Sequence, residues 1–373
     1  MREVLRELLG WWQDDVPVGM ATVVRTWRSS PRQPGATMLV GPDDTAVGSV
    51  SGGCVEGAVY ELGKDVLASG EPVRERYGVS DDDAFAVGLT CGGIIELFVE
   101  KVDRTTFPEL GQVAAAIEAG DPVAVVTVIE GPSDKFGRRL VIWPESRSGS
   151  LGSSRLDDAA TDDARGLLAA GRTDTLHYGP DGERRGSGLT LFVASYAPAA
   201  RMIVFGAIDF AAAVARIGSF LGYHVTVCDA RPVFATSKRF PGADDVVVDW
   251  PHRYLKQEID AGRVDGRTVV CVLTHDPKFD VPVLEVALEH PLAYIGAMGS
   301  RRTHEDRLTR LREAGVTEKA LERLASPIGL DLGARTPEET AVSIAAEIIA
   351  LRWGGDGGRL GERDGPIHHG VPR

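Results

Sequence analysis

Apolar and polar residues alternate along the first part of the chain in a pattern typical of a mixed α/β fold. Residues 2–13 place apolar side chains at helical spacing between charged ones, which predicts an amphipathic helix. Residues 19–27 form a mostly apolar run typical of a buried strand. Residues 36–40 and 46–50 flank a Gly-Pro-Asp-Asp turn, so we expect them to pair as a hairpin.

The alternation of helix-like and strand-like patterns continues to about residue 195. Residues 54–68 repeat apolar positions with a helical period, which predicts a helix with Cys54 in its first turn. Residues 94–99 predict an apolar strand that follows a pair of glycines. From 107 to 195 the pattern is helix, strand, a Ser/Gly-rich break at 145–154, another helix and a hairpin. We assign this segment to a second lobe of an N-terminal domain.

The C-terminal part of the chain alternates short apolar strands with helical patterns. This alternation predicts right-handed crossovers and a doubly wound, mostly parallel sheet. A Thr-Pro-Glu-Glu sequence at 336–339 predicts a capping box at the start of a last helix, which should end near Trp353. The predicted strands cover residues 202–205, 224–228, 245–248, 269–273 and 293–295.

These elements predict an α/β protein with an N-terminal mixed α/β domain followed by a C-terminal Rossmann-like doubly wound parallel sheet. A chain of 373 residues is long for one average domain, which favours two. The small-residue stretch 194–200 suits a boundary better than a core element. The expected parts are therefore residues 1–197, with lobes 1–104 and 105–197 as a further division, residues 198–355, and a loose tail at 356–373.

Charge and hydropathy exclude some classes of partner. The chain has 41 Lys and Arg residues against 54 Asp and Glu residues, and its formal net charge is -13. Such an acidic balance argues against nonspecific binding to nucleic acid, whose phosphates attract basic surfaces. No run of about 18 apolar residues occurs, and residues 1–15 are amphipathic rather than a signal peptide. We therefore expect a cytoplasmic protein that does not bind membranes.

A glycine-rich turn follows the first strand of the predicted Rossmann sheet. In this fold the turn leads to a helix N-terminus that can hold phosphate, and an acidic residue ends the second strand. Gly206 and Ala207 begin the turn here, and Asp229 lies at the offset expected for a residue that holds a ribose hydroxyl. These residues are candidates for binding NAD(P) or another nucleotide.

Two departures in the turn count against an ordinary dinucleotide. Ile208 replaces the glycine that lets the backbone approach a pyrophosphate, and Asp209 adds a negative charge beside it. A Rossmann sheet that binds no dinucleotide is the alternative. In that case Asp229 would form a salt bridge with Arg231.

A second candidate anion site follows a later strand. Gly296, Gly299, Ser300, Arg301 and Arg302 combine glycines, a capping serine and two arginines at the start of a predicted helix. An ordinary Gly/Ser loop with solvated arginines is the alternative. The position at the C-terminal end of a strand favours a binding role, because the sites of α/β proteins collect there.

A histidine follows another strand of the same sheet. His275 and Asp276 come directly after the strand at 269–273, so they are expected to face the same crevice. A binding or proton-transfer role and a purely structural role both remain open for this pair.

The four cysteines fall into two groups. Cys228 and Cys271 lie in apolar strands, so we expect them to be small core residues without chemistry. Cys54 and Cys91 adjoin paired glycines at loop junctions, where a ligand can approach the backbone. The helix dipole would also favour a thiolate at Cys54, and a thiolate suits molybdenum or transferable sulfur. The glycines concerned are Gly52, Gly53, Gly92 and Gly93.

The alternative is that these glycines only shape tight turns beside buried thiols. Two such elements in one chain favour function. The cysteine spacings make neither a disulfide framework nor a recognisable zinc site.

Several motifs together resemble the signatures of the XdhC/CoxI family. The resemblance extends from about residue 1 to residue 353. In the N-terminal half the matching segments are 30–36, 48–57, which includes Glu56, and 89–93. In the C-terminal half they are 294–296, 299–302, 327–333 and 336–339.

The resemblance implies an accessory protein for a molybdenum enzyme. Such a protein binds molybdopterin-type cofactor, helps it to receive its terminal sulfur from a cysteine desulfurase, and delivers it to a xanthine-dehydrogenase-type apoenzyme. We expect the pterin phosphate to lie in a crevice between the domains, held by the 296–302 loop and the Gly206 turn. Cys54 or Cys91 would face the sulfur ligand of the metal as the reactive thiol, and Glu56 belongs to the same cofactor-binding motif.

Two other functions compete with this interpretation. One is an NAD(P)-dependent oxidoreductase that uses His275 as acid or base, and the other is a scaffold that bridges desulfurase and apoenzyme without touching the cofactor. A self-sufficient molybdenum hydroxylase is disfavoured, because its iron-sulfur centres need more than the four cysteines present. A homodimer would suit cofactor handover, although the sequence locates no self-complementary patch.

Overall fold

The computed structural model describes residues 1–27, 30, 32–78, 93–184 and 186–363. The chain divides into two compact units that meet in sequence between Pro198 and Ala199. Part of the stretch that we expected to be a linker belongs to a strand instead. Ala194 and Tyr196 are buried at the end of β10 (Leu189–Tyr196), because their side chains join a hydrophobic core.

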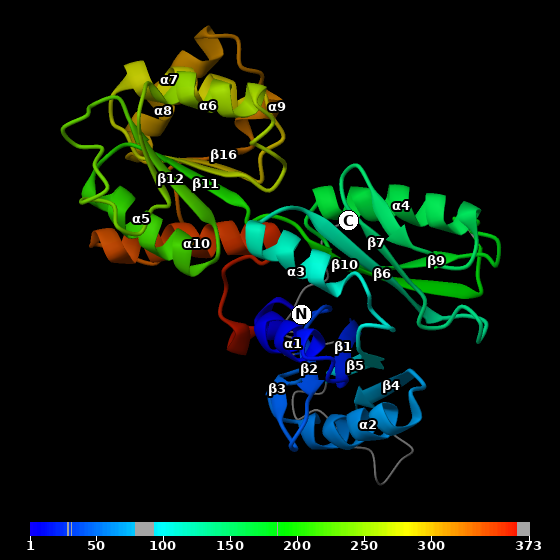
Figure 1. The fold of residues 1–373 in the computed structure, drawn as a ribbon. Coiled ribbons are helices and arrows are strands. Elements are labelled where there is room, and N and C mark those ends of the chain that lie inside the picture. Colours follow the sequence, from blue (N-terminus) through cyan, green and yellow to red (C-terminus); the bar gives the residue numbers. More distant parts are fainter. Residues whose placement is uncertain (28–29, 31, 79–92, 185, 364–373) are drawn as a thin grey trace. The chain divides into compact units, whose positions relative to one another are not determined.

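The first lobe of the first unit is a five-stranded antiparallel sheet with helices (Figure 1). The strand order is β3-β2-β1-β5-β4. The expected hairpin is confirmed, since β2 pairs with β3 and places Met38 opposite Gly48. Its elements are η1 (Arg2–Val4), α1 (Leu5–Gln13), β1 (Val18–Trp27), β2 (Thr37–Val40), β3 (Ala46–Gly48), α2 (Glu56–Ser69), β4 (Val73–Gly78) and β5 (Ile94–Val102).

The second lobe repeats the topology of the first. Its strand order, β8-β7-β6-β10-β9, corresponds position by position to that of the first lobe. The Ser/Gly-rich segment that we expected to be irregular contains the short strand β8, which pairs with β7. The elements are α3 (Leu110–Ala119), β6 (Val123–Glu130), β7 (Arg139–Ile142), β8 (Arg147–Gly149), α4 (Ser154–Ala169), β9 (Asp174–Tyr178) and β10.

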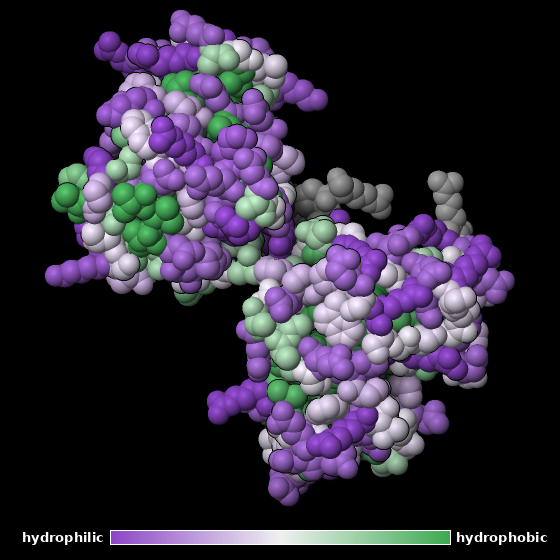
Figure 2. All heavy atoms as spheres, turned by 45° about the horizontal axis from the view of Figure 1, so that its top comes forward, coloured by the Kyte–Doolittle hydropathy of each residue, from purple (hydrophilic) through white to green (hydrophobic). Residues whose placement is uncertain are grey.

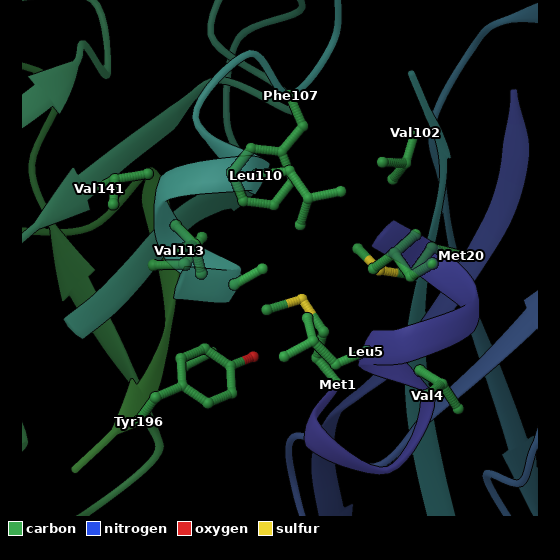
Figure 3. Packing of buried hydrophobic residues seen from close by; sticks show 14 of the residues in the cluster. Met1, Val4, Leu5, Met20, Val102, Phe107, Leu110, Val113, Val141 and Tyr196 are labelled. Carbon is green, nitrogen blue, oxygen red and sulfur yellow. The ribbon is translucent and has the colours of Figure 1, made fainter. Parts of the chain in front are cut away.

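The two lobes share one hydrophobic core (Figure 3). Leu5 of α1, Met20 of β1, Leu110 of α3 and Tyr196 of β10 belong to the same buried cluster. Helix α2 covers the other face of the first sheet, and α4 covers the other face of the second. Each buried leucine contributes roughly 1.5–3 kcal/mol. The lobes are therefore halves of one folded unit, which explains why the chain does not divide between them.

The second unit is a parallel six-stranded sheet of the Rossmann type. The strand order β13-β12-β11-β14-β15-β16 is that of the dinucleotide-binding fold, and all five pairings are parallel. The sequence predicted the first five strands, while the sixth has only two residues and gives no periodic signal. The strands are β11 (Arg201–Phe205), β12 (His224–Asp229), β13 (Asp245–Val248), β14 (Val269–Val272), β15 (Tyr294–Ala297) and β16 (Leu324–Ala325).

Helices cover both faces of this sheet (Figure 1). Helices α5 and α10 pack on one face, and α6, α7 and α8 pack on the other. The predicted capping box of α10 is confirmed, because Thr336 and Glu339 exchange their hydrogen bonds. The helices are α5 (Asp209–Phe220), α6 (Pro251–Asp260), α7 (Pro277–Leu288), α8 (Arg301–Glu313), α9 (Glu318–Leu321), α10 (Pro337–Trp353) and η2 (Leu360–Glu362).

Polar side chains cover most of the face drawn in Figure 2, and apolar side chains gather there only in small patches. Within the described ranges, no helix combines the length and the apolar character that a bilayer crossing requires.

Candidate functional site

The carboxyl ends of the parallel strands bring several predicted site residues to one edge of the second unit. In an open α/β sheet this edge is where ligands bind, because loops and helix N-termini converge there. Gly206 follows β11, Asp229 ends β12, His275 follows β14 and Ser300 follows β15. Two distant parts of the sequence, the Gly206 turn and the 296–302 loop, thus share this edge.

Position 206 accepts only a glycine, because the end of the neighbouring strand β14 lies close to it. The φ of Gly206 is +112°, and a Cβ there would lie 3.0 Å from Cγ2 of Thr274 and 3.1 Å from the carbonyl carbon of Leu273. A side chain would therefore collide with the backbone that leaves β14. The glycine lets the first turn approach the end of β14.

Asp229 uses its whole carboxylate inside the protein. Oδ2 accepts hydrogen bonds from the Ala207 amide at 2.7 Å and from Nη2 of Arg231 at 2.8 Å. Oδ1 accepts from the amide and the Nε of Arg231 at 2.8 and 2.9 Å. Because a carboxylate offers about four lone pairs, none is left for a ribose hydroxyl. The salt bridge with Arg231, one of the two roles considered for Asp229, is the one observed.

The protonation of Asp229 follows from these contacts. Burial alone would raise its pKa, but the hydrogen bonds from Arg231 and from the Ala207 amide outweigh burial, so the pKa is lowered. The residue is therefore a carboxylate that is already paired with a cation.

A second arginine reaches the same turn, and the sequence did not reveal it. Nη1 of Arg239 donates to the carbonyl oxygen of Ala207 at 3.2 Å, and its Nη2 lies 3.5 Å from Oδ1 of Asp209. Arg239 thus offsets the negative charge that Asp209 brings to the turn. The ring of Phe234 lies beneath the guanidinium groups of Arg231 and Arg239, at 4.7 and 5.5 Å. No local motif links Arg239 to the turn, because only folding brings the two segments together.

His275 and Asp276 play different parts at the end of β14. Asp276 caps α7 by accepting a hydrogen bond from the Lys278 amide at 3.1 Å, and its carboxylate pairs with Nζ of Lys278 at 2.9 Å. The contacts with Lys278 lower the pKa of Asp276. The side chain of His275 is exposed beside it. Asp276 therefore shapes the helix start, and its side chain, 46% exposed, lies at the surface as that of His275 does.

The 296–302 segment divides into a strand part and a helix start. Gly296 lies inside β15, where a Cβ would clash with the side chains of Ile328 and Tyr294, so it packs in the core and does not belong to the loop. Ser300 caps α8 by accepting from the Thr303 amide at 3.2 Å. Arg301 and Arg302, the first two residues of α8, are exposed, and neither forms an ion pair with any other described residue.

A buried ion pair supports this loop from below. Arg307 donates to the carbonyl oxygen of Met298 at 2.7 Å, to Oδ2 of Asp280 at 3.0 Å and to Oγ of Ser326 at 3.0 Å. Thr274 donates to the other oxygen of Asp280. No local sequence signal predicts this network, because an arginine in a polar helix gives no sign that it points inward.

The Gly-Gly-Cys loop of the first unit is organised around Glu56. Oε1 of Glu56 accepts from Oγ of Ser49 at 2.6 Å and from the Ser51 amide at 2.9 Å. Oε2 accepts from the hydroxyl of Ser51 and from the amides of Gly53 and Val55, the latter two at 2.8 and 3.2 Å. Burial acts to raise the pKa of Glu56, but the hydrogen bonds outweigh it and lower the pKa to about 2.

Cys54 lies outside the helix, which corrects our expectation. Helix α2 begins at Glu56 with Val55 as its N-cap, so Cys54 is half-buried in the preceding loop rather than in the first turn. Gly52 and Gly53 have φ of +80° and +115°, which are not helical values, so the helix does not extend back through this loop. The carboxylate of Glu56 also occupies the positive end of the helix dipole, which weakens the argument that this dipole favours a thiolate at Cys54.

The remaining cysteines have separate outcomes. Cys91 and Gly92 lie outside the described residues, and Gly93 is buried just before β5. Cys228 and Cys271 are fully buried in β12 and β14, as predicted, and burial raises the pKa of both thiols to about 12. Across the described part of the chain, no group of three or more His, Cys, Asp or Glu residues could hold a metal ion.

Comparisons with known proteins match both units. A family model described as the XdhC Rossmann domain matches residues 202–348, and one described as the XdhC and CoxI family matches residues 11–78 and 116–179. These two segments of the second match fall in the first and the second lobe respectively.

Related proteins align over most of the chain. A protein from Bacillus subtilis, named as a probable subunit of xanthine dehydrogenase, is 28% identical over 344 residues, which cover 91% of this chain and 94% of the relative. The molybdenum cofactor insertion chaperone PaoD of Escherichia coli is 27% identical over 333 residues, which cover 89% and 83%. A crystal structure of a xanthine dehydrogenase from Bacillus halodurans superposes with a TM-score of 0.67 and 29% identity over 94% of each chain.

Proposed function

The chain belongs to the XdhC and CoxI family, and on this premise we propose that it is a cytoplasmic accessory protein for a molybdenum enzyme. It binds a molybdopterin-type cofactor, assists its sulfuration by a cysteine desulfurase, and delivers it to a xanthine-dehydrogenase-type apoenzyme. The names of its relatives, a cofactor insertion chaperone and a probable component of xanthine dehydrogenase, support this proposal. The cofactor is cargo here, and it supplies its client with a redox-active molybdenum centre.

The observation that carries the proposal is the pair of exposed arginines at the start of α8. Arg301 and Arg302 stand at the carboxyl edge of the sheet, where the N-terminal amides of a 13-residue helix add to their positive charge. Guanidinium groups bind phosphate with two parallel hydrogen bonds. Because no described side chain neutralises this pair, it fits the terminal phosphate of a pterin cofactor.

In the proposed function, the thiol of Cys54 is the soft ligand that faces the molybdenum centre. Gly52 and Gly53 are exposed, and no atom of the described residues lies within 4 Å of a Cβ placed at either, so the described part of the chain leaves the loop open on that side. A thiol in such a place suits the metal or its transferable sulfur. Cys91 remains the second candidate thiol from the sequence.

The competing oxidoreductase finds less support in the same contacts. Nicotinamide dinucleotides use an acidic residue at the end of the second strand for the ribose, and Asp229 is already saturated by Arg231 and the Ala207 amide. We therefore favour the accessory function over NAD(P)-dependent catalysis. A homodimer remains a prediction of the sequence analysis.

The test is the pterin content of freshly purified protein. We expect oxidation of the wild-type protein to release a fluorescent pterin. The R301A/R302A variant should retain at least roughly tenfold less pterin per protein molecule than wild type. The matched control is R310A, because Arg310 is an exposed arginine on the same helix and lies away from its N-terminus. Wild-type protein without any pterin, purified from cells that make the cofactor, would favour the scaffold function instead.

A further inference from the structure

The loop that precedes α2 has a counterpart in the second lobe. Ser49 donates to the carboxylate of Glu56 at 2.6 Å, and Ser150 donates to that of Asp157 at 2.8 Å, each seven residues later. The amide after each serine also bonds the same carboxylate, from Val50 at 3.2 Å and from Leu151 at 2.7 Å. The two loops are therefore copies of one structural element.

The residues before both loops repeat as well. Gly48 and Gly149 end equivalent strands with φ of +86° and +88°. Gly48 lies opposite Met38, and Gly149 lies opposite Leu140 in the corresponding pairing. With the shared strand order, this correspondence identifies the first unit as an internal duplication.

The copies differ where the cysteine lies. In the second lobe, Ser153 caps α4, and the helix already includes Ser154 and Arg155. The equivalent positions in the first lobe, Gly53 and Cys54, precede α2 and are not helical. The pair of glycines has thus unwound the first turn of the helix, and the cysteine lies in the unwound segment.

The backbone amides of the unwound segment, like those of any helix start, need acceptors outside the helix, and Glu56 provides them. Its Oε2 accepts from the amides of Gly53 and Val55, the residues on either side of Cys54. The Cys54 amide itself donates to Oγ of Ser51 at 2.9 Å, and Ser51 also donates to Glu56. The backbone is therefore fixed on both sides of the thiol.

We propose that Glu56 is a positioning residue, whose carboxylate replaces the lost helical turn and fixes the backbone that carries Cys54. This inference rests on the proposed function only in taking Cys54 as a working thiol. This role differs from the expectation that Glu56 contacts the cofactor, because both oxygens of its carboxylate already accept hydrogen bonds from the loop. Since the same carboxylate occupies the loop amides, the loop offers a ligand the thiol of Cys54 rather than an anion-binding nest.

The duplication supplies a matched control for the test. E56Q removes the charged acceptor beside Cys54, and D157N removes its counterpart in the lobe that has an arginine in place of the cysteine. The rate of Cys54 alkylation by iodoacetamide is measured by peptide mass mapping, as a function of pH, with the melting temperature of each variant recorded. S51A is a milder second variant in case E56Q folds poorly.

We expect Cys54 of E56Q to be alkylated roughly tenfold faster than that of wild type, because the loss of hydrogen bonds to a charged group lets the loop open. S51A should change in the same direction, and D157N should keep the wild-type rate even where it lowers the melting temperature. Wild-type rates in both E56Q and S51A would overturn the inference, as would equal acceleration by D157N. The assay needs no cofactor, so its failure is distinguishable from a failure of pterin retention.

Discussion

Asp280 and Arg307 form an ion pair whose side chains are only 4% and 3% exposed, with 3.0 Å between Oδ2 and Nη2. Burial raises the pKa of Asp280, and the contacts with Thr274 and Arg307 oppose this rise. The pair joins the loop after β14 to the loop after β15, because Arg307 also holds the carbonyl oxygen of Met298. The two loops that border the proposed phosphate site are therefore held by one buried contact.

Replacing the arginine alone should be costly. R307M leaves Asp280 buried without its cation, so we expect the second unit to lose about 3–5 kcal/mol of stability. The double variant D280N/R307M should recover part of this loss, because it removes the uncompensated charge. Urea unfolding of the three proteins measures both effects.

The exposed arginine at the start of the same helix is the control. R301M should change the free energy of unfolding by no more than about 0.5 kcal/mol, as is usual for a surface position. If R307M were as mild as R301M, the pair would not hold the loops together.

Much of the fold could be predicted because its elements have local signals. The alternation of strands and helices gave the parallel sheet, and Thr336 with Glu339 gave the start of α10. The duplication of the lobes could not be predicted in the same way, since the two copies share only a few residue types around the loops, and sheet order and hydrogen bonds are needed to establish the correspondence. Asp157, for example, occupies the position that Glu56 has in the first lobe, and each carboxylate follows its serine by seven residues in the sequence.

Gly206 and Gly53 should respond differently to alanine. G206A combines a φ of +112° with a Cβ at 3.1 Å from the carbonyl carbon of Leu273, so we expect a loss of about 2–4 kcal/mol. The Cβ of G53A would meet no atom of the described ranges within 4 Å, so we expect only backbone strain of roughly 1–2 kcal/mol. Scanning calorimetry measures both, as shifts of the transitions of the second and the first unit. Equal losses would show that the contact with Leu273 does not constrain the turn.

The low pKa of Glu56 predicts a pH dependence of stability. The pKa is about 2 in the folded chain against an ordinary value of 4.5, so ionised Glu56 stabilises the fold above about pH 4.5. This contribution is lost as the pH falls from about 4.5 through about 2. We therefore expect the stability difference between wild type and E56Q to shrink over this interval, measured by urea unfolding at a series of pH values.

An exposed glutamate provides the control for the substitution itself. Glu289 is exposed at the end of α7, so E289Q should change the free energy of unfolding by no more than about 0.5 kcal/mol at neutral pH. A constant difference between wild type and E56Q from pH 5 to about pH 2 would contradict the role of the ionised carboxylate.

The candidate site was only partly visible in the sequence, for a physical reason. Some of its residues, such as Gly206 and Arg301, come shortly after a strand, and the residue types of the turn there predict their place at the site. Arg239 and Arg307 reach the same edge from other segments, and their direction depends on tertiary packing. Glu56 was recognised as part of a motif, but its role depends on hydrogen bonds from the preceding loop that only the folded chain defines.

The pairing of Asp229 with Arg231 makes a final prediction about nucleotides. Because all of its lone pairs are used, wild-type protein should bind neither NAD⁺ nor NADP⁺ with a Kd below about 1 mM in calorimetry. R231A should lose about 1–3 kcal/mol of stability, since it leaves a buried carboxylate with fewer partners, while R310A should behave like wild type. Micromolar binding of either dinucleotide by the wild type would mean that Asp229 exchanges Arg231 for a ribose, and would return the oxidoreductase to consideration.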